Sequence, residues 1–203
     1  MTTDSVIPTS WVDVAIKRWE EWDEAGRPEP IGRDIYGLDV AHKTVIAFRK
    51  GDIIKSVEKI SKPGIKQAVD FVRNRVDCEK GKGVIGIIGV GVEVHDKLRT
   101  HNYAVEGFNG SARANTTNRD GNIRFSNLRA AGWWNLRNAL DPSKEANLCL
   151  PPSEELAADL TTPKWEDVSD GKIIVESKDD IKKRLGHSTS YADAIIMAVW
   201  SSE

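Results

Sequence analysis

The order of strand-like and helix-like segments in the first half of the chain constrains the fold most. The segments are predicted in this order: strands at 35–40, 44–49 and 52–60, a helix at 63–75, a strand at 84–88, a helix at 93–101 and a strand at 103–107. Short turns join the first three strands, which predicts an antiparallel meander. The later strand, helix and strand predict a parallel pair with a right-handed crossover. These segments indicate an α/β protein with a mixed sheet.

The remaining segments are mainly helical. A helix at 10–25 is expected to begin with Ser10 as its N-cap and to stop at Gly26. Because the stretch after this helix is rich in Pro and Gly, we expect a boundary there, between a helical connector at 1–31 and the main domain at 32–203. The other predicted elements are helices at 125–140, 154–160, 178–185 and 190–200, a polar, mobile loop at 108–122, and a hairpin at 162–176 that turns at Asp170-Gly171.

Composition limits the class of protein. With 203 residues, 39% hydrophobic and 30% charged, the chain can bury one substantial core. Cys78 and Cys149 are far apart and lack metal-ligand spacing, so we expect reduced, structural thiols in an intracellular setting. The N-terminus lacks a basic region followed by an apolar stretch, and no run approaches the roughly 20 apolar residues of a membrane span. We therefore expect a soluble protein without a membrane partner.

Charge is unevenly distributed along the chain. The formal net charge is −2, yet residues 97–137 carry seven Lys and Arg against two acids. Such a stretch can follow a phosphate backbone, although a solvated helix face and loop is an equal alternative. On the helix at 125–140, Leu128 and Leu136 are expected to face inward, with Arg129 and Arg137 outside.

Two aspartates about 150 residues apart suggest chemistry. Asp39 ends the first apolar strand, and Asp193 opens the last apolar helix. With the order of elements, this pair favours a ribonuclease H-like fold, a mixed sheet with helices on both faces. In that fold the first and fourth strands are adjacent, and carboxylates at their ends hold Mg²⁺ or Mn²⁺. Taken singly, Asp39 could be a strand-end turn residue and Asp193 a helix-start acid.

Several segments together show a family resemblance. They are residues 36–47, which contain Tyr36-Gly-Leu-Asp39, and residues 88–98, 132–137, 156–162, 172–178 and 192–195. In this order they resemble the C-terminal nuclease domain of phage terminase large subunits, the DNA-packaging motors that cut concatemeric viral DNA. The resemblance covers residues 32–202.

The resemblance implies an activity and partners. It implies a metal-dependent endonuclease that cuts double-stranded DNA during packaging and uses two Mg²⁺ or Mn²⁺ ions, with Asp39 and Asp193 as catalytic metal ligands. The implied partners are the ATPase domain of the same large subunit, the portal and the small terminase subunit. The implied location is the host cytoplasm, for a viral protein that is not retained in the virion. The chain has no Gly-x-x-x-x-Gly-Lys-Ser/Thr, so it is expected to be the nuclease half alone.

The chain departs from the family pattern at two places. Where members usually carry an aspartate near the end of the fourth strand, this chain has Gly86. The loop after Asp39, residues 41–44, is shorter than in the family, so residues could be missing there. Gly86 could be an engineered inactivation, a natural divergence or a misalignment. Without that carboxylate we expect weak metal binding at the second position, unless Glu93, Asp96 or a water substitutes.

Other polar residues have secondary claims. Lys178 could meet the scissile phosphate or be a surface lysine, and His187 could bind a metal or lie in a polar loop. Asp96 has a family counterpart, although bracing its helix is the simpler interpretation. The remaining candidates flank the polar loop and could hold the DNA backbone without reading its sequence: Arg113, Arg119 and Arg124.

Two further classes stay open at the level of sequence. A module of the same fold could bind DNA or packaging partners without cutting, and Gly86 is its strongest support. Gly89 and Gly91 after an apolar strand, with Glu106 ending the next strand, imitate a dinucleotide-binding fingerprint. That imitation is incomplete, because Val94 holds the third glycine position. The fold alone does not separate terminases from resolvases and transposases.

Overall fold

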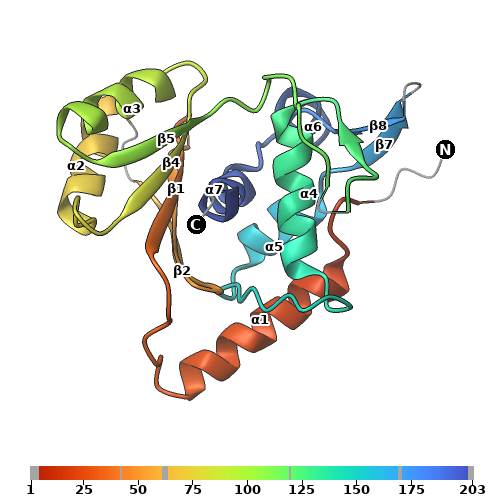
Figure 1. The fold of residues 1–203 in the computed structure, drawn as a ribbon, viewed down its shortest axis with the longest axis horizontal. Helices are drawn as coiled ribbons and strands as arrows, with labels where there is room; N and C mark the ends of the chain where they lie inside the picture. Colours follow the sequence, from red (N-terminus) through yellow and green to blue (C-terminus); the bar gives the residue numbers. More distant parts are fainter. Residues whose placement is uncertain (1–4, 42, 61–63, 119, 169–170, 201–203) are drawn as a thin grey trace.

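The architecture is described from a computed structural model covering residues 5–41, 43–60, 64–118, 120–168 and 171–200 (Figure 1). The helices are α1 Thr9–Glu24, α2 Ile65–Arg75, α3 Gly91–Thr100, α4 Leu128–Leu140, α5 Glu154–Thr161, α6 Lys178–Leu185 and α7 Ser190–Trp200. The strands are β1 Asp34–Asp39, β2 Val45–Lys50, β3 Ile53–Lys59, β4 Lys82–Gly86, β5 Ala104–Phe108, β6 Arg124–Phe125, β7 Trp165–Val168 and β8 Lys172–Val175.

The main sheet is mixed, as the sequence predicted. Its five strands lie in the order β3-β2-β1-β4-β5. The pairs β1–β2 and β2–β3 are antiparallel, and the pairs β1–β4 and β4–β5 are parallel. Leu38 of β1 lies opposite Ile85 of β4, so the first and fourth strands are adjacent. The predicted ribonuclease H-like arrangement is therefore confirmed.

The bounds of the fourth strand differ from the prediction. The strand ends at Gly86, where its pairing with β5 also ends, instead of at residue 88. The apolar run continues into the turn before α3, and the side chain of Ile88 is 57% exposed. The apolar run therefore overestimated the length of the strand. The strand ends where its backbone pairing with the neighbouring strands ends.

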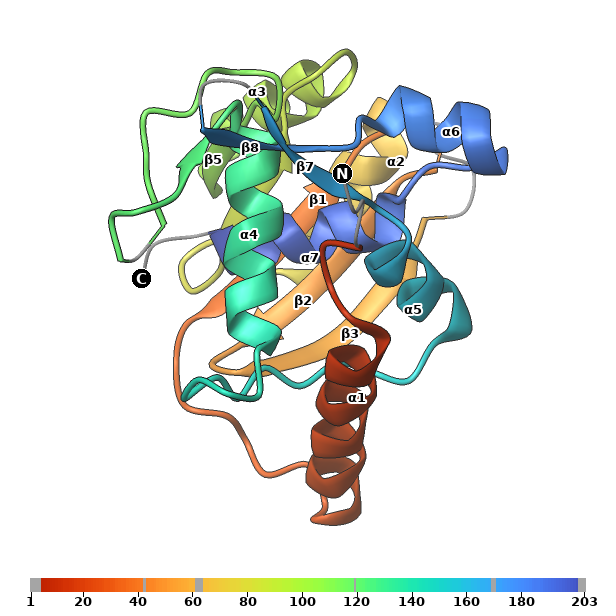
Figure 2. The same cartoon turned by 90° about the vertical axis from the view of Figure 1, so that its right-hand side faces the viewer.

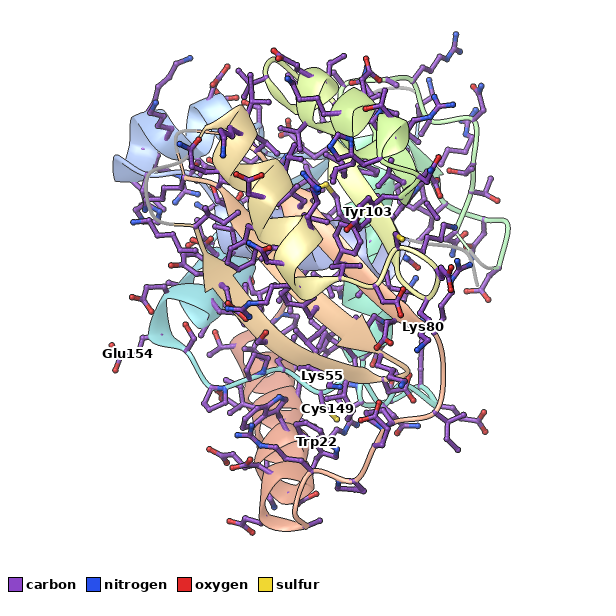
Figure 3. All side chains as sticks on the ribbon, turned by 90° about the vertical axis from the view of Figure 1, so that its left-hand side faces the viewer. Trp22, Lys55, Lys80, Tyr103, Cys149 and Glu154 are labelled. Carbon is purple, nitrogen blue, oxygen red and sulfur yellow. The ribbon has the colours of Figure 1, made fainter. Side chains whose placement is uncertain are left out.

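Helices cover both faces of the main sheet. On one face, α2 and α3 pack through a cluster that includes Val72, Val94 and Leu98. Figure 3 looks onto this face, with α2 and α3 in front of the sheet and Tyr103 packed against the cluster. On the other face, α7 crosses the sheet, α4 and α5 pack against α7, and α1 packs against α4 and α5 (Figures 1 and 2). In the described part of the chain, no helix is long and apolar enough to cross a membrane.

A second, smaller sheet has the order β6-β8-β7. Its antiparallel β7–β8 pair confirms the predicted hairpin, although Asp170 of the expected turn lies outside the described residues. The two-residue strand β6 was not predicted, because it is defined only by parallel pairing with β8, far along the chain. The helix expected from residue 125 consequently starts at Leu128, where Asn127 is the N-cap and accepts a hydrogen bond from the amide of Ala130.

The first described residues belong to the same core. Val6 and Ile7 are fully buried, and the Val6 amide donates to the carbonyl of Pro163 at 2.8 Å. Ser5 forms an antiparallel bridge with Lys164, next to β7. The predicted N-cap Ser10 is wrong: α1 begins at Thr9 after Pro8, whose fixed φ of −63° holds extended backbone before the helix.

The remaining features are the packing of α1, the state of the two cysteines and the predicted boundary. Val12 and Ala15 of α1 join the apolar cluster that includes α4, α5 and α7. Cys78 and Cys149 are both free thiols, as expected. The division of the chain into a connector at 1–31 and a domain at 32–203 stays a prediction.

The backbones of β1 and α7 approach each other closely. A Cβ added at Gly37 would lie 2.0 Å from the carbonyl oxygen of Ala194 and 2.4 Å from the amide nitrogen of Ala198. The helix backbone therefore rests directly on the strand backbone, because Gly37 has no side chain. This contact fixes where α7 begins relative to the end of β1.

We expect Gly37→Ala to destabilise the fold by about 1–3 kcal/mol, the usual cost of overpacking a core. Gly86→Ala, on the neighbouring strand, is the control: its added Cβ would lie 3.5 Å from the Met197 sulfur, an ordinary contact. Urea unfolding of both variants measures the difference. Equal midpoints for the two variants and the parent would contradict the close packing described for Gly37.

Candidate functional site

The two candidate aspartates lie together although they are far apart in sequence. Asp39 ends β1 and Asp193 lies in the first turn of α7, and each is only 6% exposed. The Nζ of Lys178, the first residue of α6, lies 2.9 Å from Oδ1 of Asp39 and 3.0 Å from Oδ2 of Asp193. One ammonium group therefore bridges both carboxylates.

A second cation completes the cluster. Nη1 of Arg129 lies 2.8 Å from Oδ1 of Asp193, and Nε donates to the carbonyl oxygen of Glu176 at 3.2 Å. The expectation that Arg129 faces outward from α4 is wrong: its side chain is only 12% exposed. Helical periodicity assigns an arginine to the solvent-exposed face of a helix. Here the guanidinium is buried because it forms an ion pair with Asp193. Thr189 also donates to Oδ2 of Asp193 at 3.0 Å.

The pKa values of the two carboxylates are shifted in opposite directions. Burial raises the pKa of Asp39 above its usual value, because Lys178 offsets only part of the lost hydration and the charge of Asp193 repels. Burial also acts to raise the pKa of Asp193, but the positive charges of Lys178 and Arg129 outweigh it and lower that pKa. Burial acts to lower the pKa of Lys178, and Asp193 and Asp39 more than compensate and raise it. Asp193 is therefore the firmly ionised member of the pair.

The carboxylates border a cavity of about 680 Å³. Its apolar lining includes Ile88, Phe108, Trp165 and Met197. Gly86 also lines it, and a Cβ at this position would lie 3.8 Å from Oδ1 of Asp39 and 3.5 Å from the sulfur of Met197. There is thus room at Gly86 for a side chain directed at the site.

The donor set suits a divalent cation in part. Oxygen ligands are those that Mg²⁺ and Mn²⁺ prefer. Oδ2 of Asp39 is buried and has no hydrogen-bond partner among the described residues, so it is an acceptor without a donor. The described residues contain no group of three or more His, Cys, Asp or Glu placed to hold a metal. The residues present therefore fit a cation with two carboxylates, and Gly86 stands where a third could be added.

The structure places the other candidates away from this cluster. Arg113 and Arg124 are exposed, in the loop after β5 and on β6, while Arg119 lies outside the described residues. Asp96 is 65% exposed on α3, with Oδ1 3.0 Å from Nδ1 of His95. Nδ1 of His187 lies 3.9 Å from Asp159. Arg113, Arg124, Asp96 and His187 are not part of the cavity lining. The roles of these four residues and of Arg119 stay predictions.

The sequence analysis missed Asp159, a buried carboxylate on α5. Its Oδ2 accepts a hydrogen bond from the backbone amide of Tyr191 at 2.9 Å, so it caps the start of α7 from another helix. Burial raises its pKa to about 6, with a further contribution from the charge of Asp193. Nothing in the local sequence marks this role, because the capped helix begins about 30 residues later.

Asp159→Asn should change how stability depends on pH. The folded-state pKa of Asp159 is above the unfolded value of about 3.9, so the folded state binds the proton more tightly. Stability from this group is therefore present below about pH 4 and is lost as pH rises to about 6. The asparagine keeps an acceptor oxygen but does not ionise.

The measurement is thermal unfolding of parent and variant at pH 4.5 and 7.5. Relative to the parent, the variant should gain on the order of 2 kcal/mol between these values. A constant difference across the range would show that Asp159 is not the titrating group.

The comparison with solved structures supports the fold. No family model and no curated protein matches the sequence. Among solved structures, a lysine-to-alanine mutant of the nuclease domain of the large terminase subunit gp2 of bacterial virus Sf6, with manganese and beta-thujaplicinol, superposes with a TM-score of 0.80. It shows 17% identity, over 98% of this chain and all of that one.

Two other phage proteins show the same arrangement. The large terminase nuclease of thermophilic phage G20c with bound magnesium matches at a TM-score of 0.60 and 11% identity, over the whole of both chains. The large terminase of another thermophilic bacteriophage matches at 0.52 and 10% identity, over 83% of this chain and 40% of that one. The chain therefore has the ribonuclease H-like fold of terminase nuclease domains.

Proposed function

We propose that this chain is the metal-dependent nuclease domain of a viral terminase large subunit, which cuts concatemeric double-stranded DNA during genome packaging. The observation that carries the proposal is the convergence of Asp39 and Asp193 beside a cavity. It occurs in a fold whose solved neighbours include terminase nuclease domains with manganese or magnesium. The likeness is one of fold, and the activity is the proposal.

Asp39 and Asp193 are the residues that would hold the metal. When bound, two divalent ions would supply an activated water and stabilise the charge on the leaving oxygen. Oδ2 of Asp39, for which the described residues supply no hydrogen-bond donor, would be available as a ligand atom. Asp193 is kept ionised by Arg129 and Lys178, and Thr189 orients its second oxygen.

Lys178 and more distant arginines would bind and orient the substrate. Lys178 lines the cavity and is 37% exposed, so its ammonium group can reach a phosphate oxygen there. Arg113, Arg119 and Arg124 would hold the DNA backbone without sequence preference. The ATPase domain of the same subunit, the portal and the small terminase subunit are the proposed partners, and the host cytoplasm is the proposed location.

A catalytically weakened binding module of the same fold is the second candidate. The specific observation that favours it is Gly86, which lines the cavity beside Asp39 without a side chain. The cluster of Asp39, Asp193, Lys178 and Arg129 has no net negative charge of its own to attract Mg²⁺ or Mn²⁺. Among the described residues, the carboxylates of the other acids in the cavity lining, such as Asp179 and Asp180, do not contact this cluster.

Gly86→Asp should raise the rate of plasmid cleavage in Mn²⁺ and Mg²⁺. The new carboxylate would fit the space at this position and add the charge that the site lacks. We expect at least a 100-fold increase, roughly the effect of restoring a catalytic group. The measurement is nicking and linearisation of supercoiled plasmid. If neither form cuts, the binding module replaces the nuclease as the proposed function.

Asp39→Asn and Asp193→Asn should each abolish cleavage in whichever form is active. Each change removes a charged metal ligand while keeping the shape of the side chain. Asp70→Asn is the control and should cut like the parent. Asp70 is a partly exposed residue of α2, the helix on the opposite side of the sheet. Thermal melting should show folded protein in all three. Cleavage that survives both site variants would exclude these aspartates as the ligands.

A further inference from the structure

Arg129 is held more rigidly than any role as a counter-charge requires. Its guanidinium contacts Asp193 through Nη1 and the backbone carbonyl of Glu176 through Nε, and it lies 5.7 Å from the ring centre of Trp133. These contacts come from three elements: α7, the junction of β8 with α6, and α4 itself. A planar guanidinium held at two edges has little freedom to turn.

The two cations of the site differ in this respect. Lys178 contacts both carboxylates through one ammonium group at the end of a flexible chain, and its side chain is 37% exposed. The side chain of Arg129 is 12% exposed and is tied to the main chain at Glu176. Lys178 is therefore the more exposed of the two cations, and of the two side chains only that of Arg129 hydrogen-bonds to the main chain of the described residues.

The carboxylate of Asp193 is correspondingly restrained. Oδ1 receives the hydrogen bond from Arg129, and Oδ2 receives one from Thr189. With a donor on each oxygen, rotation about the bond to the carboxylate would break both hydrogen bonds. Asp39 lacks this restraint on Oδ2, which has no partner among the described residues.

Arg129 is poorly suited to stability alone. Its Nη2 is buried and has no hydrogen-bond partner among the described residues. A buried donor without a partner costs about 1–3 kcal/mol. A smaller group with fewer donors would fill this position at lower cost, so the geometry favours a role in arranging Asp193.

We infer that Arg129 is a positioning residue, which orients the carboxylate of Asp193 for binding a divalent cation by joining it to the backbone of Glu176. This inference rests on the proposed function. A role in positioning and a role in charge alone have different consequences. Positioning needs a guanidinium that contacts Asp193 through Nη1 and the Glu176 carbonyl through Nε. Neutralisation of Asp193 needs only a positive charge.

Arg129→Lys separates these roles because it keeps the positive charge and loses the planar group that contacts both Asp193 and the carbonyl of Glu176. If Arg129 positions Asp193, the variant should bind Mn²⁺ about 10–100-fold more weakly, the usual effect of removing a residue that orients a metal ligand. If Arg129 acts only as a charge, Arg129→Lys should bind like the parent. In that case Arg129→Gln should bind Mn²⁺ more tightly, because a repelling charge is gone.

Arg184→Lys is the matched control. Arg184, on α6, lies 2.6 Å from the carboxylate of Glu176 and forms no ion pair with Asp193 in the described part of the chain. The Arg184→Lys variant should bind Mn²⁺ like the parent. The measurement is calorimetric titration with Mn²⁺ alone, in the parent sequence and in the Gly86→Asp form, with thermal melting to confirm that each variant is folded.

The possible results separate the inference from the proposed function. If neither the parent nor the Gly86→Asp form binds Mn²⁺, the proposed metal site fails, and the role of Arg129 fails with it. If the parent or the Gly86→Asp form binds and Arg129→Lys in that form binds equally well, the positioning role is wrong while the nuclease proposal stands. Weaker binding in Arg129→Lys with unchanged binding in Arg184→Lys supports the inference.

Discussion

The direct contact between the backbones of β1 and α7 determines the geometry of the site. Gly37 leaves no side chain between the strand and the helix, so the helix rests against the strand near Ala194 and Ala198. Asp39 lies two residues after Gly37, and Asp193 lies one residue before Ala194. The contact therefore brings two carboxylates from distant parts of the chain to one place. A bulkier residue at position 37 would move both the strand end and the helix start.

Two buried carboxylates that lie close together repel each other, and two cations in the fold offset this repulsion. Removing charges from water is costly unless they are paired and hydrogen-bonded. Lys178 bridges both aspartates, and Arg129 contacts Asp193. The pairing is unequal, which leaves Asp39 with a buried oxygen that lacks a donor among the described residues. The cluster is thus satisfied on the side of α7 and unsatisfied on the side of β1, next to Gly86.

Sequence patterns predicted the parts of this arrangement that depend on periodicity and element order. The meander and the parallel pair followed from runs of apolar residues and short turns. The adjacency of the first and fourth strands followed from the ribonuclease H-like fold that this order of elements favours. The meeting of Asp39 and Asp193 followed from that topology together with a family resemblance. The same reasoning predicted that Gly86 lies beside Asp39, as the structure shows.

The parts that depend on long-range pairing could not be predicted. Arg129 reads as a solvent-exposed residue of an amphipathic helix until Asp193 is known to lie opposite it. Asp159 acts on α7 from α5, and β6 exists only because it pairs with β8. In each case the deciding partner is more than 30 residues away, beyond the reach of local propensity.

The N-terminal segment has a mechanical consequence. Ser5 and Val6 are joined to Lys164 and Pro163, and Lys164 lines the cavity. The Glu176 amide in turn donates to the Lys164 carbonyl, and the carbonyl of Glu176 accepts from Arg129. Tension applied to the polypeptide before Ser5 would thus be transmitted through backbone hydrogen bonds to the wall of the cavity and, through one arginine, to Asp193. Ser5 and Val6 therefore act as an attachment point through which a load on the chain would reach the wall of the candidate site.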